Sequence, residues 1–274
     1  MTMITAFYLT HSPAAYVLLG LFSLAIGSLL NAVIYRLPLM MTQETSQVNL
    51  FFPRSFCPEC KKTIPAYHNI PLLSFLLLRG RCSHCKKTIP KRYFAVEVLS
   101  LILALFAAWH FGFTLKLGFV LCFLWILIAL FFIDLKHQLL PDSLTLGLLW
   151  IGLIANTQSL FTPLPVAVLS ACGAYLALWF FINGYYLLTG KEGMGQGDFK
   201  LFAAFGAWFG FTQLPLILLL ASFTGAILGL MYLKKQGKTR DTPIPFGPFL
   251  CFAGCISLFW GDAIVRWYIQ YTLY

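Results

Sequence analysis

Residues 117–134 read LGFVLCFLWILIALFFID, an uncharged apolar run that ends in an aspartate. A run of about 17–25 predominantly apolar residues can cross a bilayer as an α-helix. Charged residues make up only 10% of the 274-residue chain and hydrophobic residues 59%, whereas a soluble domain carries about 25% charged residues. The composition therefore excludes a soluble globular enzyme, a disordered chain and a nucleic-acid-binding module, and it indicates an all-α polytopic membrane protein.

Similar apolar stretches recur along the whole chain and predict about eight transmembrane helices. The sixth of them is short, so it is either a half-span or a longer helix that continues toward Lys200. The predicted segments are 14–35, 94–111, 117–133, 144–162, 165–188, 201–211, 214–233 and 248–261.

Lysine and arginine fall almost entirely on one side of this arrangement. Ten lie in the loop 36–92 and seven in the third, fifth and seventh loops, while only Lys116 and Arg266 lie on the other side. Because cytoplasmic loops carry an excess of these residues, the distribution predicts cytoplasmic odd-numbered loops and both termini outside the cytoplasm. The first basic residue, Arg36, follows the first apolar run, so we expect a retained anchor and not a signal peptide.

Two CxxC pairs, Cys57-Pro-Glu-Cys60 and Cys82-Ser-His-Cys85, lie in the basic first loop. Their spacing is typical of a zinc site, in which each pair supplies two thiolates to one tetrahedral ion. In the reducing cytoplasm structural disulfides are rare, so the alternative is two reduced or redox-active pairs. The other four cysteines lie in apolar segments and are expected to act as small hydrophobic residues; they are Cys122, Cys172, Cys251 and Cys255.

Two aspartates adjoin apolar helices at the predicted cytoplasmic ends. Asp134 ends the run quoted above, and Asp198 directly precedes the sixth apolar segment. An ionisable residue at such a place is costly and is a candidate for function. Two carboxylates held together can divide the roles of acid and base and activate a water for attack on a peptide carbonyl. The glycines before Asp198, among them Gly195 and Gly197, would let the chain approach another backbone closely or adopt a positive φ.

Structural roles for these carboxylates remain open at this point. Asp134 could pair with Lys136 or His137, and Asp198 with Lys200. Asp142 has the position of a residue that caps the next helix. Spacing alone does not make Asp134 a better catalyst than Asp142.

The chain resembles the type IV prepilin peptidases, which are bifunctional leader peptidases and N-methyltransferases of the GxGD-type aspartic protease class. The resemblance covers nearly the whole chain and rests on motifs that occur in the family's order. These are Gly27-Ser-Leu-Leu-Asn-Ala-Val-Ile-Tyr-Arg-Leu-Pro38, the two cysteine pairs, Asn69-Ile-Pro71, Leu78-Arg-Gly80, Arg92-Tyr93 with Glu97, Ile133-Asp134 with Leu139-Leu-Pro-Asp142, Gly195-Gln-Gly-Asp198-Phe-Lys200 and Pro245-Phe-Gly-Pro-Phe249. The chain departs from the family pattern at Lys61-Lys62, where many relatives have Gly-His, and at Phe94, where proline is frequent.

The resemblance implies roles by position. Asp134 and Asp198 match the family's catalytic aspartates, and Asp142 matches an acidic position that is not the catalyst. The four cysteines of the CxxC pairs match its zinc ligands. The implied substrates are prepilins or pseudopilins with a basic leader, cleaved at a Gly-Phe type junction at the cytoplasmic face of the bacterial inner membrane. The implied domains are 1–93, an anchor helix with a zinc-binding loop associated with methyl transfer, and 94–274, the transmembrane peptidase.

The resemblance also implies that S-adenosylmethionine donates a methyl group to the new N-terminal amine. The sequence has no glycine-rich fingerprint for such a cofactor, so its site stays unassigned. By their position alone, three residues are candidates for a role in methyl transfer: Arg36, Glu59 and Asn69.

Two functions from other classes compete with the peptidase. A transporter could use Asp134 and Asp198 to carry ions, but the sequence has no internal repeat and the aspartates lie at a membrane face instead of the midplane. A non-catalytic assembly subunit would use the aspartates only as helix caps.

Overall fold

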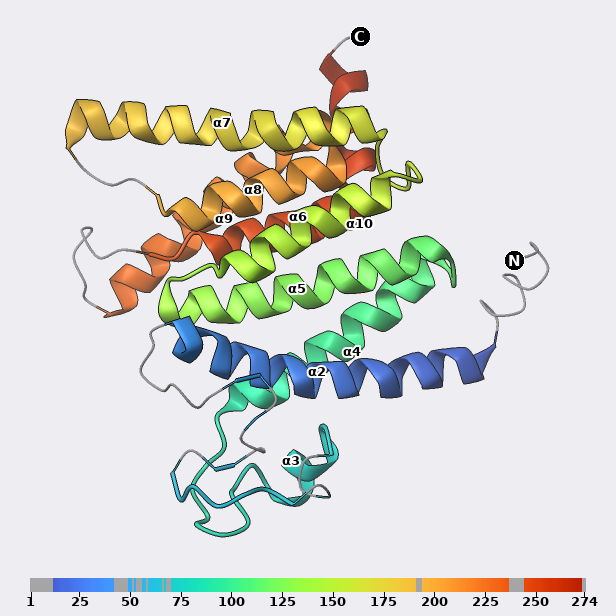
Figure 1. Ribbon diagram of the computed structural model, residues 1–274, viewed down its shortest axis with the longest axis vertical. Coiled ribbons are helices and arrows are strands. Elements are labelled where there is room, and N and C mark those ends of the chain that lie inside the picture. Colours follow the sequence, from blue (N-terminus) through green and yellow to red (C-terminus); the bar gives the residue numbers. More distant parts are fainter. Residues whose placement is uncertain are drawn as a thin grey trace. The chain divides into compact units, whose positions relative to one another are not determined.

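The computed structural model describes residues 12–41, 49–50, 52, 56–57, 59–65, 67, 70–190, 194–236 and 244–272. Within these residues the regular structure is helical, with two isolated β-bridges in the cysteine-containing loop. The helices, shown in Figure 1, are α2 (Pro13–Met41), α3 (Leu73–Leu77), α4 (Lys91–Phe111), α5 (Leu115–His137), α6 (Asp142–Asn156), α7 (Leu164–Thr189), α8 (Gln196–Phe209), the 3₁₀ turn η2 (Phe211–Gln213), α9 (Leu214–Gln236) and α10 (Gly247–Thr272).

All the predicted apolar segments contain a helix, which confirms the all-α membrane fold. Among the described residues, six helices are long and apolar enough to cross a membrane: α2, α4, α5, α7, α9 with its preceding turn, and α10. The helices α6 and α8 are shorter, with 15 and 14 residues. The sixth segment does extend to include Lys200. The predicted segment 144–162 was too long, because residues 157–162 form turns between α6 and α7.

The chain divides into two compact units, residues 1–129 and 130–274, with the boundary inside α5. In the first unit, α2 packs closely on α4 through small side chains. The hydroxyls of Ser23 and Ser100 each donate a hydrogen bond of 2.8 Å to the other residue's carbonyl oxygen. A Cβ on Gly27 would lie 3.0 Å from the Cα of Glu97. Small residues and interhelical hydrogen bonds of this kind drive helix association where apolar burial does not.

In the second unit, α8 is the buried central helix. Its residues 201–209 are all buried, and two glycines allow neighbouring helices to come close. A Cβ on Gly206 would lie 2.6 Å from the carbonyl oxygen of Ser170 in α7, and Gly152 of α6 lies against the Trp208 ring. The Trp208 indole N–H donates to the carbonyl oxygen of Leu148 at 2.9 Å. A helix of 14 residues is therefore held on several sides by protein, and its N-terminal end is fixed.

The buried Asn156 joins the end of α6 to the end of α8 and shapes the turn that follows. Its amide nitrogen donates to the Ala207 carbonyl oxygen at 2.7 Å, and its amide oxygen accepts from the backbone N–H groups of Phe161 and Thr162 at 3.0 and 3.1 Å. Replacing Asn156 with Leu should lower the free energy of unfolding by about 2 kcal/mol, because buried backbone groups lose their partners. Unfolding in detergent micelles with increasing sodium dodecyl sulfate measures this. Asn183→Leu is the control, since Asn183 bonds only within α7; equal midpoints for the two variants would contradict the role of Asn156.

Candidate active site

Asp134 and Asp198 lie close together in the second unit. Asp134 is near the C-terminal end of α5, and Asp198 is the third residue of α8. Their residues are 5% and 7% exposed, and their charges interact directly. Leu140 lies between two glycines that adjoin the aspartates. A Cβ on Gly197, which precedes Asp198, would lie 2.7 Å from the Leu140 Cβ, and a Cβ on Gly247, which lies next to Asp134 in space, would lie 3.2 Å from the Leu140 Cδ1. The structure therefore brings together two carboxylates separated by 64 residues in sequence.

The carboxylate of Asp134 is held by the first residue of α10. The backbone N–H of Gly247 donates a hydrogen bond to it. A helix N-terminus presents free N–H groups and favours a negative charge. A Cβ on Gly247 would lie 2.6 Å from Asp134 Oδ2, so only glycine allows this approach without a shift of one of the two residues.

The carboxylate of Asp198 is held by the start of its own helix. Gly195 precedes the first residue of α8, and its backbone N–H donates to the Asp198 carboxylate. The Asp198 N–H in turn bonds the Gly195 carbonyl oxygen at 3.1 Å. The carboxylate thus satisfies a backbone N–H that has no partner within the helix, as an acidic residue in the first turn can do. The expected close approach of this glycine-containing segment is confirmed at Gly197, which contacts Leu140.

Each carboxylate keeps one buried oxygen without a hydrogen-bond partner. These are Asp134 Oδ2 and Asp198 Oδ1, and within the described part of the chain neither aspartate forms an ion pair. Two adjacent carboxylates without a cation cannot both ionise easily, so they favour sharing one proton. A pair of this kind can supply one acid and one base to a water molecule placed between them.

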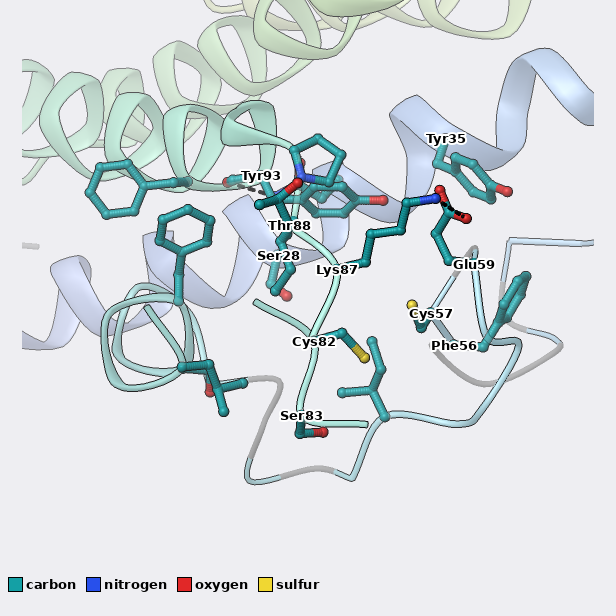
Figure 2. Close-up of a pocket in the computed structure, with 18 of the residues that line it drawn as sticks. Ser28, Tyr35, Phe56, Cys57, Glu59, Cys82, Ser83, Lys87, Thr88 and Tyr93 are labelled. Atoms are coloured by element: carbon teal, nitrogen blue, oxygen red, sulfur yellow. Dashed lines mark hydrogen bonds and ion pairs between the residues drawn. The ribbon is translucent and has the colours of Figure 1, made fainter. Parts of the chain in front are cut away.

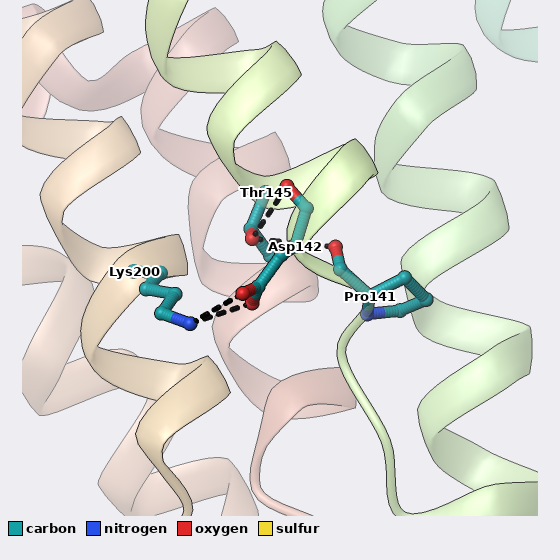
Figure 3. Close-up of polar contacts among 4 residues, drawn as sticks. All are labelled: Pro141, Asp142, Thr145 and Lys200. Atoms are coloured by element: carbon teal, nitrogen blue, oxygen red, sulfur yellow. Dashed lines mark hydrogen bonds and ion pairs between the residues drawn. The ribbon is translucent and has the colours of Figure 1, made fainter. Parts of the chain in front are cut away.

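Asp142 has a different environment from the two buried aspartates. The Lys200 ammonium donates to both of its oxygens, at 2.6 and 2.7 Å (Figure 3). This ion pair joins the first residue of α6 to α8, and the Asp142 side chain is 58% exposed. One alternative left open by the sequence is therefore excluded, because Lys200 pairs with Asp142 and not with Asp198. Asp142 is the first residue of α6 as expected, but its carboxylate accepts from Lys200 and does not cap the helix.

Sequence reasoning missed two residues of this site. The position of Gly247 in the segment Pro245-Phe-Gly-Pro-Phe249 was a signal, but only the fold shows that its N–H reaches Asp134. The buried Cys251 follows one turn later in α10 and lies within electrostatic range of both carboxylates. Nothing in the sequence distinguished Cys251 from the other cysteines of the apolar segments.

The first unit brings the four cysteines of the CxxC pairs together. Their Sγ atoms all lie within 4.8 Å of one another, and those of Cys57 and Cys85 are 3.9 Å apart. Zinc–sulfur bonds of about 2.3 Å in a tetrahedron place sulfurs about 3.8 Å apart. The cluster therefore has the size of a four-thiolate metal site.

The two CxxC turns share one backbone structure. In each, the N–H of the first cysteine bonds the carbonyl oxygen five residues later, at 3.0 Å in one and 2.9 Å in the other. Lys61 and Lys86 occupy equivalent positions with φ of 55° and 59°, a left-handed conformation that glycine adopts more readily than lysine. The backbone N–H groups of Cys85 and His84 lower the pKa of the Cys82 thiol to about 6, whereas burial and the neighbouring thiols raise the pKa of Cys85 to about 11. Sulfurs this close cannot all ionise easily without a cation between them.

The residues suspected of a role in methyl transfer lie beside this cluster. Glu59 pairs with Lys87 at 2.6 Å, and this contact raises the pKa of the lysine. The buried Arg36 donates to the carbonyl oxygens of Asn49 and Leu50 at 3.1 and 3.0 Å. Asn69 lies outside the described residues.

The fold and these sites define a polytopic membrane protein with a buried aspartate pair in one unit and a four-cysteine cluster in the other. Comparison with known proteins also finds two matching regions. Residues 21–111 match the bacterial peptidase A24 N-terminal domain, and residues 121–230 match the type IV leader peptidase family.

Similar curated proteins cover the whole chain. A prepilin leader peptidase/N-methyltransferase of Legionella pneumophila is 59% identical over 99% of this chain and 100% of its own. Proteins with the same name from Stutzerimonas stutzeri and Pseudomonas aeruginosa are 48% and 47% identical, each over 97% of this chain and 98% and 97% of their own. The chain belongs to the type IV leader peptidase family. No solved structure matches it.

The contact between Gly247 and Asp134 predicts a sensitive backbone position. In Gly247→Ala, the new Cβ would meet Asp134 Oδ2, so we expect peptide cleavage to fall by at least about tenfold as the carboxylate is displaced. A membrane assay with a prepilin substrate measures the rate. Gly147→Ala in α6 is the matched control, because its Cβ would meet nothing within 4 Å. If both variants cleave at the wild-type rate, Gly247 does not position Asp134.

Proposed function

We propose that this chain is an intramembrane aspartic endopeptidase that removes the basic leader of prepilins or pseudopilins and then methylates the new N-terminal amine. The observation that carries the peptidase is the pair Asp134 and Asp198, two buried carboxylates that interact with each other and have no cationic partner among the described residues. Three relatives that cover nearly the whole chain carry the name prepilin leader peptidase/N-methyltransferase, which supports the substrate class.

In this proposal the two aspartates divide the roles of acid and base. The ionised carboxylate takes a proton from a water molecule, and the water oxygen attacks the carbonyl carbon of the scissile peptide bond. The protonated carboxylate donates its proton to the carbonyl oxygen. When the carbon–nitrogen bond breaks, the leaving amine receives a proton from the pair. The hydrogen bonds from Gly195 and Gly247 hold the two carboxylates in place during these steps.

The charge distribution supports a site at the cytoplasmic face. Asp134 lies near Lys136, and Asp198 lies near Lys200, at the helix ends that the excess of basic residues assigns to the cytoplasm. A substrate with an apolar helix and a basic leader would take the same orientation, so its scissile bond and the aspartate pair would meet at one depth. Both termini of this chain would then lie outside the cytoplasm.

We infer that the four-cysteine cluster holds one structural zinc ion. Four thiolates complete a tetrahedron and leave no open position for a substrate, so the ion would stabilise the two CxxC turns without taking part in chemistry. The 3.9 Å separation of two of the sulfurs supports this ion.

The N-methyltransferase name of the relatives supports S-adenosylmethionine as the methyl donor. In the proposed division of the chain, residues 1–93 provide the anchor helix and the zinc-binding region associated with methyl transfer, and residues 94–274 provide the peptidase. The helix α4 begins near this boundary and packs in the first compact unit, with the cysteine cluster. The cysteine cluster and the aspartate pair lie in different compact units. Membership of the leader peptidase family does not favour a transporter or a non-catalytic assembly subunit.

The zinc proposal predicts the metal content of purified protein. Wild-type chain should carry about one zinc ion, and Cys57→Ser or Cys82→Ser should carry much less, because each removes one of four ligands. Elemental analysis of the protein in detergent measures the content. The exposed Cys172 in α7 gives the control Cys172→Ser, which should keep its zinc. Unchanged zinc in the Cys57 and Cys82 variants would exclude the cluster as the site.

The two-aspartate mechanism predicts a contrast among three substitutions. Asp134→Asn and Asp198→Asn should each lower prepilin cleavage in membranes by at least about 100-fold, since each removes the acid or the base. Asp142→Asn should stay within about fivefold of wild type, because an exposed ion pair contributes about 1 kcal/mol or less. Expression and zinc content are compared for all variants. Wild-type cleavage by Asp134→Asn or Asp198→Asn would refute the mechanism.

A further inference from the structure

The first unit contains a cavity of about 280 Å³ that neither proposed catalytic group touches. It lies between α2, the start of α4 and the two CxxC turns, and its size approaches that of known small-ligand pockets. Figure 2 shows Ser28 and Tyr35 of α2, Tyr93 of α4, and Cys57 and Cys82 around this space.

Basic side chains at the wall of the cavity already have partners. The Lys87 ammonium is paired with Glu59 at 2.6 Å (Figure 2). The Arg36 guanidinium donates to two backbone carbonyl oxygens. Lys62 and His84 also line the cavity, but both are exposed to solvent. None of these four basic side chains is therefore both buried and without a partner.

Two buried acceptors at the wall are incompletely satisfied. Glu97 of α4 is 9% exposed, and within the described residues its carboxylate accepts one hydrogen bond, from the Leu72 N–H at 2.8 Å, and forms no ion pair. Asn31 of α2 is 3% exposed, and its amide nitrogen donates to the Tyr93 carbonyl oxygen at 3.0 Å. A carbonyl can only accept, so this bond identifies Asn31 Oδ1 as the atom left without a partner.

These acceptors favour a ligand that carries a positive charge. A buried carboxylate without a cation costs several kcal/mol, and a buried amide oxygen without a donor costs about 1–3 kcal/mol. A cationic group with N–H donors would offset both costs. The rings of Tyr35 and Tyr93 also line the cavity, and aromatic faces attract ammonium and sulfonium cations.

We propose that this cavity binds a cationic reactant of N-methyl transfer, with its charge against Glu97 and Asn31. The proposal rests on the methyltransferase activity proposed above. Two reactants have the required charge: S-adenosylmethionine, through its sulfonium and ammonium groups, and the new N-terminal amine of the cleaved substrate in its ammonium form. Before the transfer the ammonium gives one proton to water, and the lone pair of the resulting neutral amine then forms the N–CH₃ bond while the electrons of the S–CH₃ bond stay on sulfur. Positive charge therefore moves from sulfur to nitrogen, and S-adenosylhomocysteine leaves with a neutral sulfur.

The first test compares S-adenosylmethionine with S-adenosylhomocysteine, which lacks the sulfonium charge. Binding of each to the full chain in detergent is measured by equilibrium dialysis. Wild-type protein should bind S-adenosylmethionine at least tenfold more tightly than S-adenosylhomocysteine, and Glu97→Gln should reduce this preference to less than threefold. Asp198→Asn, which lies outside the cavity, is the control and should keep the wild-type preference. Zinc content confirms that the Glu97→Gln protein has kept its fold.

A second arm tests the amine as the source of the charge. A peptide that begins with phenylalanine is compared with its N-acetylated form, which has no ammonium group. If the free peptide binds at least tenfold more tightly and Glu97→Gln removes that difference, the cavity holds the acceptor amine. The proposal is overturned if wild-type protein distinguishes neither pair, or if Glu97→Gln changes neither preference.

A third measurement does not depend on whether the Glu97 variant folds. Radiolabelled S-adenosylmethionine or an N-terminally photoreactive peptide is crosslinked to wild-type protein by light. Label in residues 28–36 or 89–97 supports the proposal, and label confined to residues 130–274 overturns it. Mass analysis of cleaved pilin separates this inference from the proposed function. If wild-type protein methylates pilin but the label lies outside the cavity, only this inference is refuted. If wild-type protein does not methylate pilin, the proposed methyltransferase activity itself is refuted.

Discussion

A carboxylate buried without a cation costs several kcal/mol, and Asp134 and Asp198 are two such groups in one unit. The surrounding structure offsets this cost with backbone N–H groups from Gly195 and Gly247. Each donor lies at the start of a helix, where N–H groups have no partner within the helix. At Gly247 the absence of a side chain makes this approach possible, because a Cβ there would lie 2.6 Å from Asp134 Oδ2, whereas at Gly195 it would make only an ordinary contact of 3.6 Å with Asp198 Oδ2.

The buried helix α8 keeps this pair in place. Its residues 201–209 are enclosed by protein, and the ion pair between Lys200 and Asp142 joins its second turn to the start of α6. Close packing at Gly206 allows α7 to approach along its length. Since α8 is a short helix surrounded by longer ones, its position depends on side-chain packing and not on its own length in a bilayer.

A related situation exists in the first unit. Glu97 and Asn31 are buried acceptors without full partners, and they lie on the two helices that pack through Ser23, Gly27 and Ser100. The tight packing on one side of Glu97 leaves the cavity on its other side, next to the CxxC turns. Both units thus contain buried carboxylates that no ion pair among the described residues neutralises.

The sequence by itself determined the membrane class, the helical segments and the four-cysteine cluster, because apolar runs and CxxC spacing are local patterns. The resemblance of its motifs also selected Asp134 and Asp198. Only the tertiary structure decided that these two are buried together while Asp142 is exposed and paired with Lys200. It also decided that Gly247 reaches Asp134 and that α6 ends at Asn156. The physical reason is that burial and ion pairing depend on which helices pack together, and contacts between residues far apart in sequence leave no local pattern.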